Sequence, residues 1–197
     1  MKISNLKVYD LEESMLASGY PMRTKLDKET PDEKDKARCL NLTKASNGNG
    51  AHGQWMTGVR VAFDLRTSLK MWIEAERYRF LEFVSSQSTM HRIAKFDIKS
   101  QCNDYVDPWI LDRVDALKKE YLKDPENKEA YLKLLYNIPS GFELTARVTT
   151  DYRCLLNIYV QRHDHRLPEW REFCQYLIDE LPMFNELVEA YNSKGEK

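Results

Sequence analysis

Apolar and polar residues alternate in three segments of the chain, which is the pattern of β-strands with one buried face. The first segment covers residues 2–9, with apolar members at Ile3, Leu6 and Val8. The second covers residues 59–64 and the third residues 142–148. The alternation therefore predicts three strands that contribute to a sheet.

Apolar residues at spacings of three and four predict helices in much of the remaining chain. We expect helices over residues 11–18, 69–83, 108–123, 130–136 and 168–181, the last of which would be the final helix. Residues 25–38 are almost wholly charged, which favours an exposed connection or a short solvated helix. The helix over residues 69–83 would place Arg77 and Arg79 within one turn, where two guanidinium groups repel each other unless an anion joins them.

A further helix, predicted over residues 151–162, carries polar side chains inside an otherwise apolar pattern. Arg153 and Asn157 lie four residues apart and share one face of this helix. Arg162 lies nine residues after Arg153 and is turned roughly half a revolution away, at about 100° per residue. The two arginines should therefore serve different surroundings.

Composition predicts one globular domain over residues 1–197. The chain has 197 residues, of which 42% are hydrophobic and 31% are charged, enough for one substantial core. Its formal net charge is -1, so no bulk electrostatic attraction draws it to nucleic acid or to an anionic membrane. No apolar run reaches the length of a membrane span, and the first residues lack the apolar core of a signal peptide. We therefore expect a cytoplasmic protein with neither partner.

Several familiar chemistries find no support in the sequence. The four cysteines are far apart and are expected to be reduced and mostly buried thiols. His163 and His165 alternate without a supporting cysteine or second carboxylate, which favours a polar loop over a metal site. The chain has no Gly-x-Ser-x-Gly elbow and no glycine-rich phosphate loop. Phosphate groups would have to be bound by arginines and hydroxyls.

Candidate ligand-binding groups occur before and after the predicted helix over residues 69–83. The turn at residues 47–50 can present His52 on a loop. Residues 85–92 are rich in hydroxyl groups and end at Arg92, so they can donate several hydrogen bonds to phosphate oxygens. The same residues are also suited to a helix N-cap and a surface loop, and each arginine alone is equally compatible with a surface ion pair.

Taken together, these residues resemble the flavin-dependent thymidylate synthases, the thymidylate-synthase-complementing family. The signature of that family is Arg-His-Arg followed by a serine-containing segment that ends in arginine, and here it reads Arg77-Tyr78-Arg79 followed by Ser88 and Arg92. A histidine on a preceding loop corresponds to His52. The resemblance continues over the later helix, in the residues Asp151, Arg153, Asn157 and Arg162, and in the segment Glu169-Trp170-Arg171. It covers roughly residues 51–92 and 145–171.

The resemblance implies a mixed α/β (α+β) fold, with an antiparallel sheet flanked by helices, in a homotetramer. It also implies reductive methylation of dUMP, or of a related pyrimidine nucleotide, at C5, with FAD as cofactor and NADPH and methylenetetrahydrofolate as co-substrates. The implied flavin-binding residues are His52, Arg77, Tyr78, Arg79, Arg153 and Asn157. The implied nucleotide-binding residues are Glu74, Gln87, Ser88, Arg92 and Arg162. Arg162 would also be the catalytic residue, because a guanidinium directed at the pyrimidine carbonyl stabilises the negative charge that develops during attack from C5.

Four positions depart from the pattern of the family. Tyr78 replaces the histidine of the signature, Thr57 replaces a glutamate, Glu74 replaces a substrate-side glutamine and Asp151 replaces an asparagine. A carboxylate at Glu74 would repel an anionic nucleotide unless a cation such as Arg92 compensates it. Two alternatives therefore stay open: a non-catalytic nucleotide-binding protein that has kept the fold and lost flavin chemistry, and a helical interaction protein whose arginines form surface ion pairs.

Overall fold

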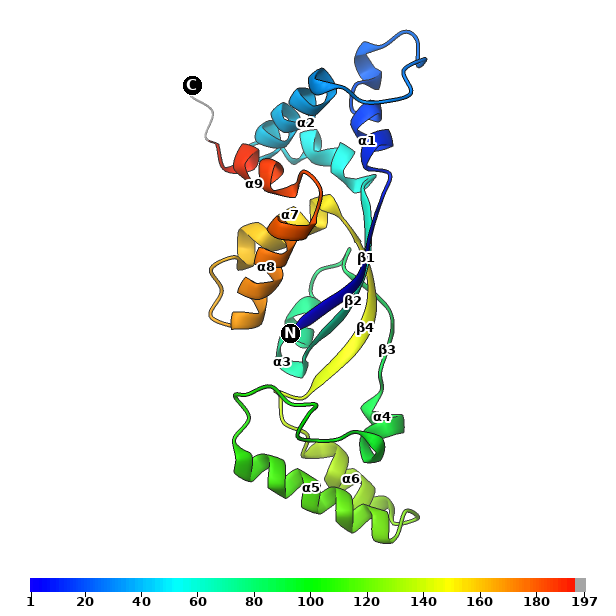
Figure 1. Ribbon diagram of the computed structural model, residues 1–197, viewed down its shortest axis with the longest axis vertical. Coiled ribbons are helices and arrows are strands. Elements are labelled where there is room, and N and C mark those ends of the chain that lie inside the picture. The colour runs from blue at the N-terminus through cyan, green and yellow to red at the C-terminus, as the bar shows by residue number, and fades with distance from the viewer. Residues whose placement is uncertain (194–197) are drawn as a thin grey trace. The chain divides into compact units, whose positions relative to one another are not determined.

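Residues 1–193, which the computed structural model describes, contain four strands that form one antiparallel sheet with the order β1-β2-β4-β3 (Figure 1). The strands are β1 (Lys2–Tyr9), β2 (Arg60–Ser68), β3 (Glu82–Ser86) and β4 (Glu143–Asp151). The mixed fold and the antiparallel sheet expected from the resemblance are confirmed. The expectation that the second strand buries one face is wrong, because Val61, Ala62 and Phe63 are consecutive and all buried.

The chain forms two compact units, each assembled from separate segments. The first unit contains residues 1–4, 64–77 and 83–148. Its helices are α3 (Leu69–Ala75), the short α4 (Thr89–Arg92), the 3₁₀-helix η3 (Ile93–Lys95), α5 (Pro108–Lys123) and α6 (Lys128–Tyr136). The single domain expected over residues 1–197 stays a prediction.

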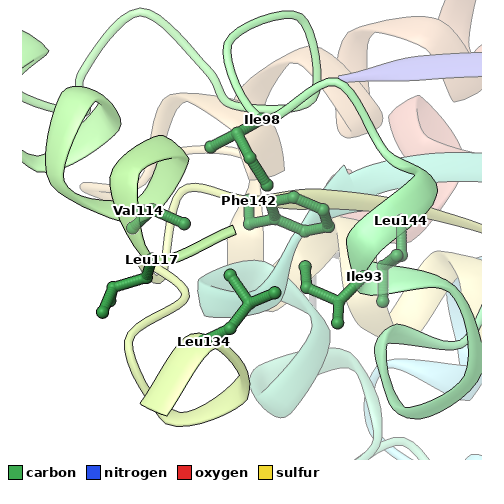
Figure 2. Close-up of a cluster of buried hydrophobic side chains, with 7 residues drawn as sticks. All are labelled: Ile93, Ile98, Val114, Leu117, Leu134, Phe142 and Leu144. Carbon is green, nitrogen blue, oxygen red and sulfur yellow. The ribbon is translucent and has the colours of Figure 1, made fainter. Parts of the chain in front are cut away.

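A hydrophobic cluster forms the core of this first unit. Figure 2 shows it with Phe142 near its middle, surrounded by Ile93, Ile98, Val114, Leu117, Leu134 and Leu144. Phe142 and Leu134 are fully buried, and Phe96 packs edge-on against Phe142 with ring centres 5.5 Å apart. Helices α5 and α6 thus pack against the segment that leads into β4. The helix predicted over residues 108–123 is confirmed with the same bounds.

The second unit contains residues 5–63 and 78–82, together with the chain from residue 149 onward. Its helices are α1 (Leu11–Ala17), η1 (Tyr20–Met22), α2 (Glu33–Ser46), η2 (Gly50–Thr57), α7 (Tyr152–Arg162), α8 (Pro168–Glu180) and α9 (Phe184–Asn192). Aromatic rings fill its core, where Phe63 packs against Phe173 and Tyr152 packs edge-on against Phe184. Helix α7 begins directly after β4, and the Tyr152 N–H donates to the Val59 carbonyl at 3.1 Å.

Three expectations about helices need correction. The charged segment over residues 25–38 is a mostly exposed connection before α2, as expected, but α2 has 14 residues and so is not a short helix, and Asp35 within the segment is buried. The helix expected to end at residue 181 is not the final one, because α9 follows it after Pro182.

The third error concerns the helix expected over residues 69–83. Helix α3 ends at Ala75, because the apolar residues that gave the helical spacing belong to a helix, a turn and a strand. Ile73 and Phe80 are 68% and 56% exposed, whereas Phe83 lies in β3. Arg77 and Arg79 therefore lie in a turn and not within one helical turn.

Candidate functional site

Arg162, the last residue of α7, is held against two aromatic rings of the second unit. Its Nε donates a hydrogen bond of 2.8 Å to the Tyr78 hydroxyl. The guanidinium carbon lies 5.7 Å from the centre of the Tyr78 ring and 5.0 Å from that of Trp170. Both distances allow a cation–π attraction, and both rings are buried. The aromatic rings thus fix the guanidinium while leaving it partly exposed.

Tyr78 connects Arg162 to the exposed side of α7. Its hydroxyl donates to Gln161 Oε1 at 3.0 Å, and Gln161 Nε2 donates to Asn157 Oδ1 at 3.0 Å. Residues Arg162, Tyr78, Gln161 and Asn157 therefore form one continuous chain of hydrogen bonds. Asn157, which the sequence pattern grouped with Arg153, is thereby linked to Arg162.

The loop between α7 and α8 supports Arg162 from a second side. Arg162 Nη1 lies 2.8 Å from His165 Nε2, and the Leu167 nitrogen lies 3.2 Å from His165 Nδ1. A guanidinium can only donate and a neutral imidazole has one acceptor nitrogen, so a hydrogen bond from Arg162 to Nε2 places the ring proton on Nδ1. Arg171 in turn donates to the carbonyls of His165 and Arg166. The segment that the sequence predicted to be a polar loop is thus an ordered support for Arg162.

Helix η2 places a second set of predicted residues beside the first half of α7. Arg153 Nη1 donates to Gln54 Oε1 at 2.7 Å. A Cβ atom on Gly50 would lie 3.2 Å from Arg153 Nη2, so a glycine there lets the backbone approach the guanidinium. His52 is exposed on the same short helix. Arg153 and Arg162 have different partners, as the turn of the helix predicted.

Asp151 begins α7 as its N-cap. Its carboxylate accepts from the Cys154 N–H at 2.9 Å and lies 3.4 Å from Arg60 Nη1. Burial raises the pKa of the Asp151 carboxyl, while the Cys154 N–H and the Arg60 charge act in the opposite direction. An aspartate at this position therefore serves the helix terminus, as an asparagine also can.

The predicted nucleotide-binding residues other than Arg162 belong to the first unit. Gln87 pairs with β4 in both directions: its N–H donates to the Thr145 carbonyl, and its Oε1 accepts from the Thr145 N–H, each at 2.9 Å. Ser88 directly precedes α4, which ends at Arg92, and Arg92 is exposed. The Gln87 side chain is thus fixed by the strand, with its amide nitrogen as its donor group.

Glu74 lies on α3, where the Lys70 ammonium is 3.8 Å from its carboxylate. The sequence suggested Arg92 as the compensating cation, whereas the structure places Lys70, one helical turn earlier, beside Glu74. A pair at this distance is weak, because both side chains are in contact with solvent.

Four arginines of the predicted set make no ion pair with a carboxylate anywhere in residues 1–193. They are Arg77, Arg79, Arg92 and Arg153. By contrast, Arg60, Arg66 and Arg147 each have a carboxylate partner. Guanidinium groups without such partners are suited to phosphate oxygens. Within the second unit, Arg79 and Arg153 are such groups.

Sequence reasoning missed four residues of this region. Gln54, Gln161, His165 and Trp170 hold predicted ligand residues in place. The spacing of Gln161, four residues after Asn157, was the one available signal for a side-chain pair. The contact of Gln161 with Tyr78 spans 83 residues of sequence and leaves no local pattern.

Comparison with known proteins identifies the fold. No family model matches the chain, and no curated protein matches its sequence. Two solved structures of the flavin-dependent thymidylate synthase ThyX from Helicobacter pylori, both with FAD and dUMP, are similar to it. One is 15% identical with a TM-score of 0.73 and covers 95% of this chain and 97% of ThyX. The other is 14% identical with a TM-score of 0.73 and covers 98% and 100%.

A third solved structure is the UMP/dUMP methylase PolB from Streptomyces cacaoi, bound with 5-Br dUMP. It is 14% identical, has a TM-score of 0.63 and covers 95% of each chain. The chain therefore has the fold of the flavin-dependent thymidylate synthases, and the fold expected from the resemblance is confirmed. No helix in residues 1–193 combines the length and the apolar character that crossing a membrane requires.

Proposed function

We propose that the protein is an enzyme that reductively methylates dUMP, or a related pyrimidine nucleotide, at C5, with methylenetetrahydrofolate as carbon donor. The proposed cofactor is FAD, which supplies a hydride after reduction by NADPH. The observation that carries the proposal is Arg162, held by Tyr78, Trp170 and His165, in a chain with the fold of ThyX. The similar ThyX structures contain FAD and dUMP, which is the ligand pair that we assign to this chain.

Within the proposal, the cations of the chain neutralise the two anionic ligands. Arg77, Arg79 and Arg153, with His52, bind FAD through its diphosphate and its ring system, and Gln54 orients the Arg153 guanidinium. The Gln87 amide nitrogen, the Ser88 hydroxyl and Arg92 bind the nucleotide. A planar guanidinium can make two parallel hydrogen bonds to a phosphate, which is why arginines without carboxylate partners support this assignment.

Arg162 is the proposed catalytic residue. Its guanidinium donates to a carbonyl of the pyrimidine and stabilises the negative charge that develops there as C5 attacks the carbon donor. The bonds from Arg162 to Tyr78 and His165 hold the guanidinium in one orientation, so little reorganisation is needed during the reaction. We also propose a homotetramer, as the resemblance implies, which sedimentation of the purified protein tests.

The visible spectrum tests flavin binding directly. The purified protein, with and without added FAD, should show the shifted absorbance of bound flavin. Arg153→Ala should weaken FAD binding by about tenfold, because one charge-assisted hydrogen bond contributes on the order of 1.5 kcal/mol or more. Arg113→Ala, on the exposed surface of α5, is the matched control and should leave FAD binding unchanged. Equal FAD affinity in all three proteins would overturn the assignment of Arg153.

The second candidate function is a nucleotide-binding protein without flavin chemistry. It is favoured by Tyr78, whose hydroxyl is committed to both Arg162 and Gln161 and which stands in place of the signature histidine. A protein that binds dUMP in calorimetry and shows no flavin spectrum with excess FAD would establish this alternative. A protein that binds neither ligand would favour an interaction protein.

The identity of the nucleotide is a separate question. The similar methylase PolB is described as acting on UMP and dUMP, so both nucleotides should be tested. Glu74 places a carboxylate at a position where the resemblance implies a nucleotide ligand. We expect Glu74→Gln to tighten dUMP binding severalfold, because removing a negative charge reduces repulsion of the phosphate. Unchanged affinity in calorimetry would show that Glu74 does not face the nucleotide.

A further inference from the structure

The hydrogen bonds from Arg162 to Asn157 have a direction that the chemistry of the side chains fixes. A guanidinium carries only N–H donors, so the Tyr78 oxygen must accept from Arg162 Nε at 2.8 Å. The single hydroxyl proton of Tyr78 is then directed to Gln161, where Oε1 accepts it at 3.0 Å. Because Tyr78 accepts from Arg162, its own hydroxyl proton is donated to Gln161.

The same reasoning determines the orientation of the side-chain amides of Gln161 and Asn157. An amide has an oxygen that accepts and a nitrogen that donates, and its neighbours decide which end faces them. Because Gln161 Oε1 faces Tyr78, Gln161 Nε2 faces α7 and donates to Asn157 Oδ1 at 3.0 Å. The acceptor atom of Asn157 is therefore engaged.

Asn157 presents its other end to the surroundings. The residue is exposed on α7, and Gln161 is its one side-chain hydrogen-bond partner within residues 1–193. With Oδ1 engaged, the group of Asn157 that a ligand meets is the Nδ2 amino group. Reversal of the amide would turn Asn157 Nδ2 toward Gln161 Nε2 and place two donors against each other.

We propose that Arg162, Tyr78 and Gln161 fix Asn157 as a hydrogen-bond donor, so that the ligand atom bound there is an acceptor, such as a carbonyl oxygen, a phosphate oxygen or an unprotonated ring nitrogen. Tyr78 and Gln161 are positioning residues, because they act through Asn157. The inference rests on the proposed function for the ligands themselves: a flavin and a pyrimidine nucleotide both offer such acceptors. A ring N–H or a ribose hydroxyl donor is disfavoured at this position.

A double-mutant cycle on the full chain tests the coupling. Gln161→Glu replaces the donating nitrogen by an oxygen, so Asn157 must turn its amino group toward residue 161 and its oxygen outward. Asn157→Ala removes the group through which Gln161 acts. We would measure the Kd of FAD by quenching of flavin fluorescence and the Kd of dUMP by calorimetry for wild type, both single variants and the double variant. The ligand whose Kd changes is the one that Asn157 contacts.

The expected result is that Gln161→Glu weakens binding of one of the two ligands about tenfold and has no further effect in the Asn157→Ala protein. The added negative charge alone would weaken binding equally in both backgrounds, so that outcome, or no loss at all, overturns the inference. Gln175→Glu on α8, an exposed glutamine that donates to an acidic side chain four residues later, is the matched control. It should leave both Kd values unchanged.

Failure of the proposed reaction can be distinguished from failure of the inference about Gln161. A wild-type protein that binds FAD or dUMP but transfers no carbon to C5 overturns the proposed reaction, whereas the cycle still supports or overturns the role of Gln161. A wild-type protein that binds neither ligand overturns both. Unfolding in urea, followed for every variant, confirms that the binding losses are measured on folded protein.

Discussion

Tyr78 connects Arg162, through Gln161, to Asn157, which the sequence pattern placed on a different face of α7. Its hydroxyl accepts from Arg162 and donates to Gln161, and only 8% of the residue is exposed. The resemblance placed Tyr78 among flavin ligands, a role that stays a prediction. Its hydrogen bonds give it a second role, as the link between Arg162 and Asn157, which could not be read from the sequence because it depends on contacts across more than 80 residues.

Removal of the Tyr78 hydroxyl should measure this link. We expect Tyr78→Phe to lower the free energy of unfolding by about 1–3 kcal/mol, because Gln161 and Arg162 each lose a partner in a partly buried region. Urea unfolding followed by circular dichroism measures the change. Tyr105→Phe is the control, since Tyr105 is 82% exposed. Equal stability of the two variants would contradict the role assigned to Tyr78.

Asp35 is a second residue whose structural role could not be predicted from its segment, because nearly all of the neighbouring residues are also charged. It is 1% exposed, and its carboxylate contacts Arg23, Lys28 and Arg38. The Lys28 ammonium, and after it the Arg38 guanidinium, hold the pKa of the Asp35 carboxyl far below its usual range, against the effect of burial. One buried carboxylate thus holds three cations at the first turn of α2.

The pKa of Asp35 predicts how its contribution depends on pH. Because the folded pKa lies below the unfolded value of about 4, the stabilisation is complete above that pH and is lost as the pH falls toward the folded pKa. Asp35→Asn should lower the free energy of unfolding by about 2 kcal/mol at pH 7, since it leaves three cations without their carboxylate. The difference from wild type should shrink below about pH 4. Asp27→Asn, at an exposed position, should show neither effect.

Among the elements, α7 carries the largest share of the candidate site. Its first residues pack beside η2, and its last residue rests on Tyr78 and Trp170. The sequence predicted this helix well because Leu155, Leu156 and Tyr159 recur at helical spacing and because Asp151 at its start is an N-cap residue, both of which are local signals. The helix expected over residues 69–83 was wrong because exposed Ile73 and Phe80 imitate a buried helical face. Exposure is decided by the tertiary fold and not by the spacing.

The N-cap of α7 offers a test at the level of the element. Burial raises the pKa of the Asp151 carboxyl, so the folded protein holds its proton more tightly than the unfolded chain, and stability falls as the pH rises through the folded pKa. Asp151→Asn keeps a capping oxygen without the charge and should melt at or above the wild-type temperature at pH 7. This advantage should disappear below about pH 4.

Asp151→Ala provides the contrast, because alanine has no capping oxygen. It should lower the free energy of unfolding by about 1 kcal/mol at pH 7. Thermal melts of the two variants at pH 7 and pH 4 measure both effects. A loss of stability in Asp151→Asn equal to that in Asp151→Ala would show that the charge of Asp151, and not its capping hydrogen bond, supports α7.

For the whole molecule, the sequence predicted the fold more completely than it predicted the candidate functional site. A short signature and a later helix were enough to predict the fold of a protein family at 14–15% identity to its solved structures. These segments carry the charged and polar residues that we propose as ligand-binding groups. The supporting residues Gln54, Gln161, His165 and Trp170 were missed, because each acts on a ligand residue through a contact that only folding creates.

The most direct test of the proposed function is the mass of the nucleotide after incubation of the protein with dUMP, methylenetetrahydrofolate, FAD and NADPH. We expect a product heavier than dUMP by one methylene group, formed only when all four compounds are present and lost in Arg162→Ala. A protein that binds FAD and dUMP but returns dUMP unchanged under these conditions would contradict the proposed reaction.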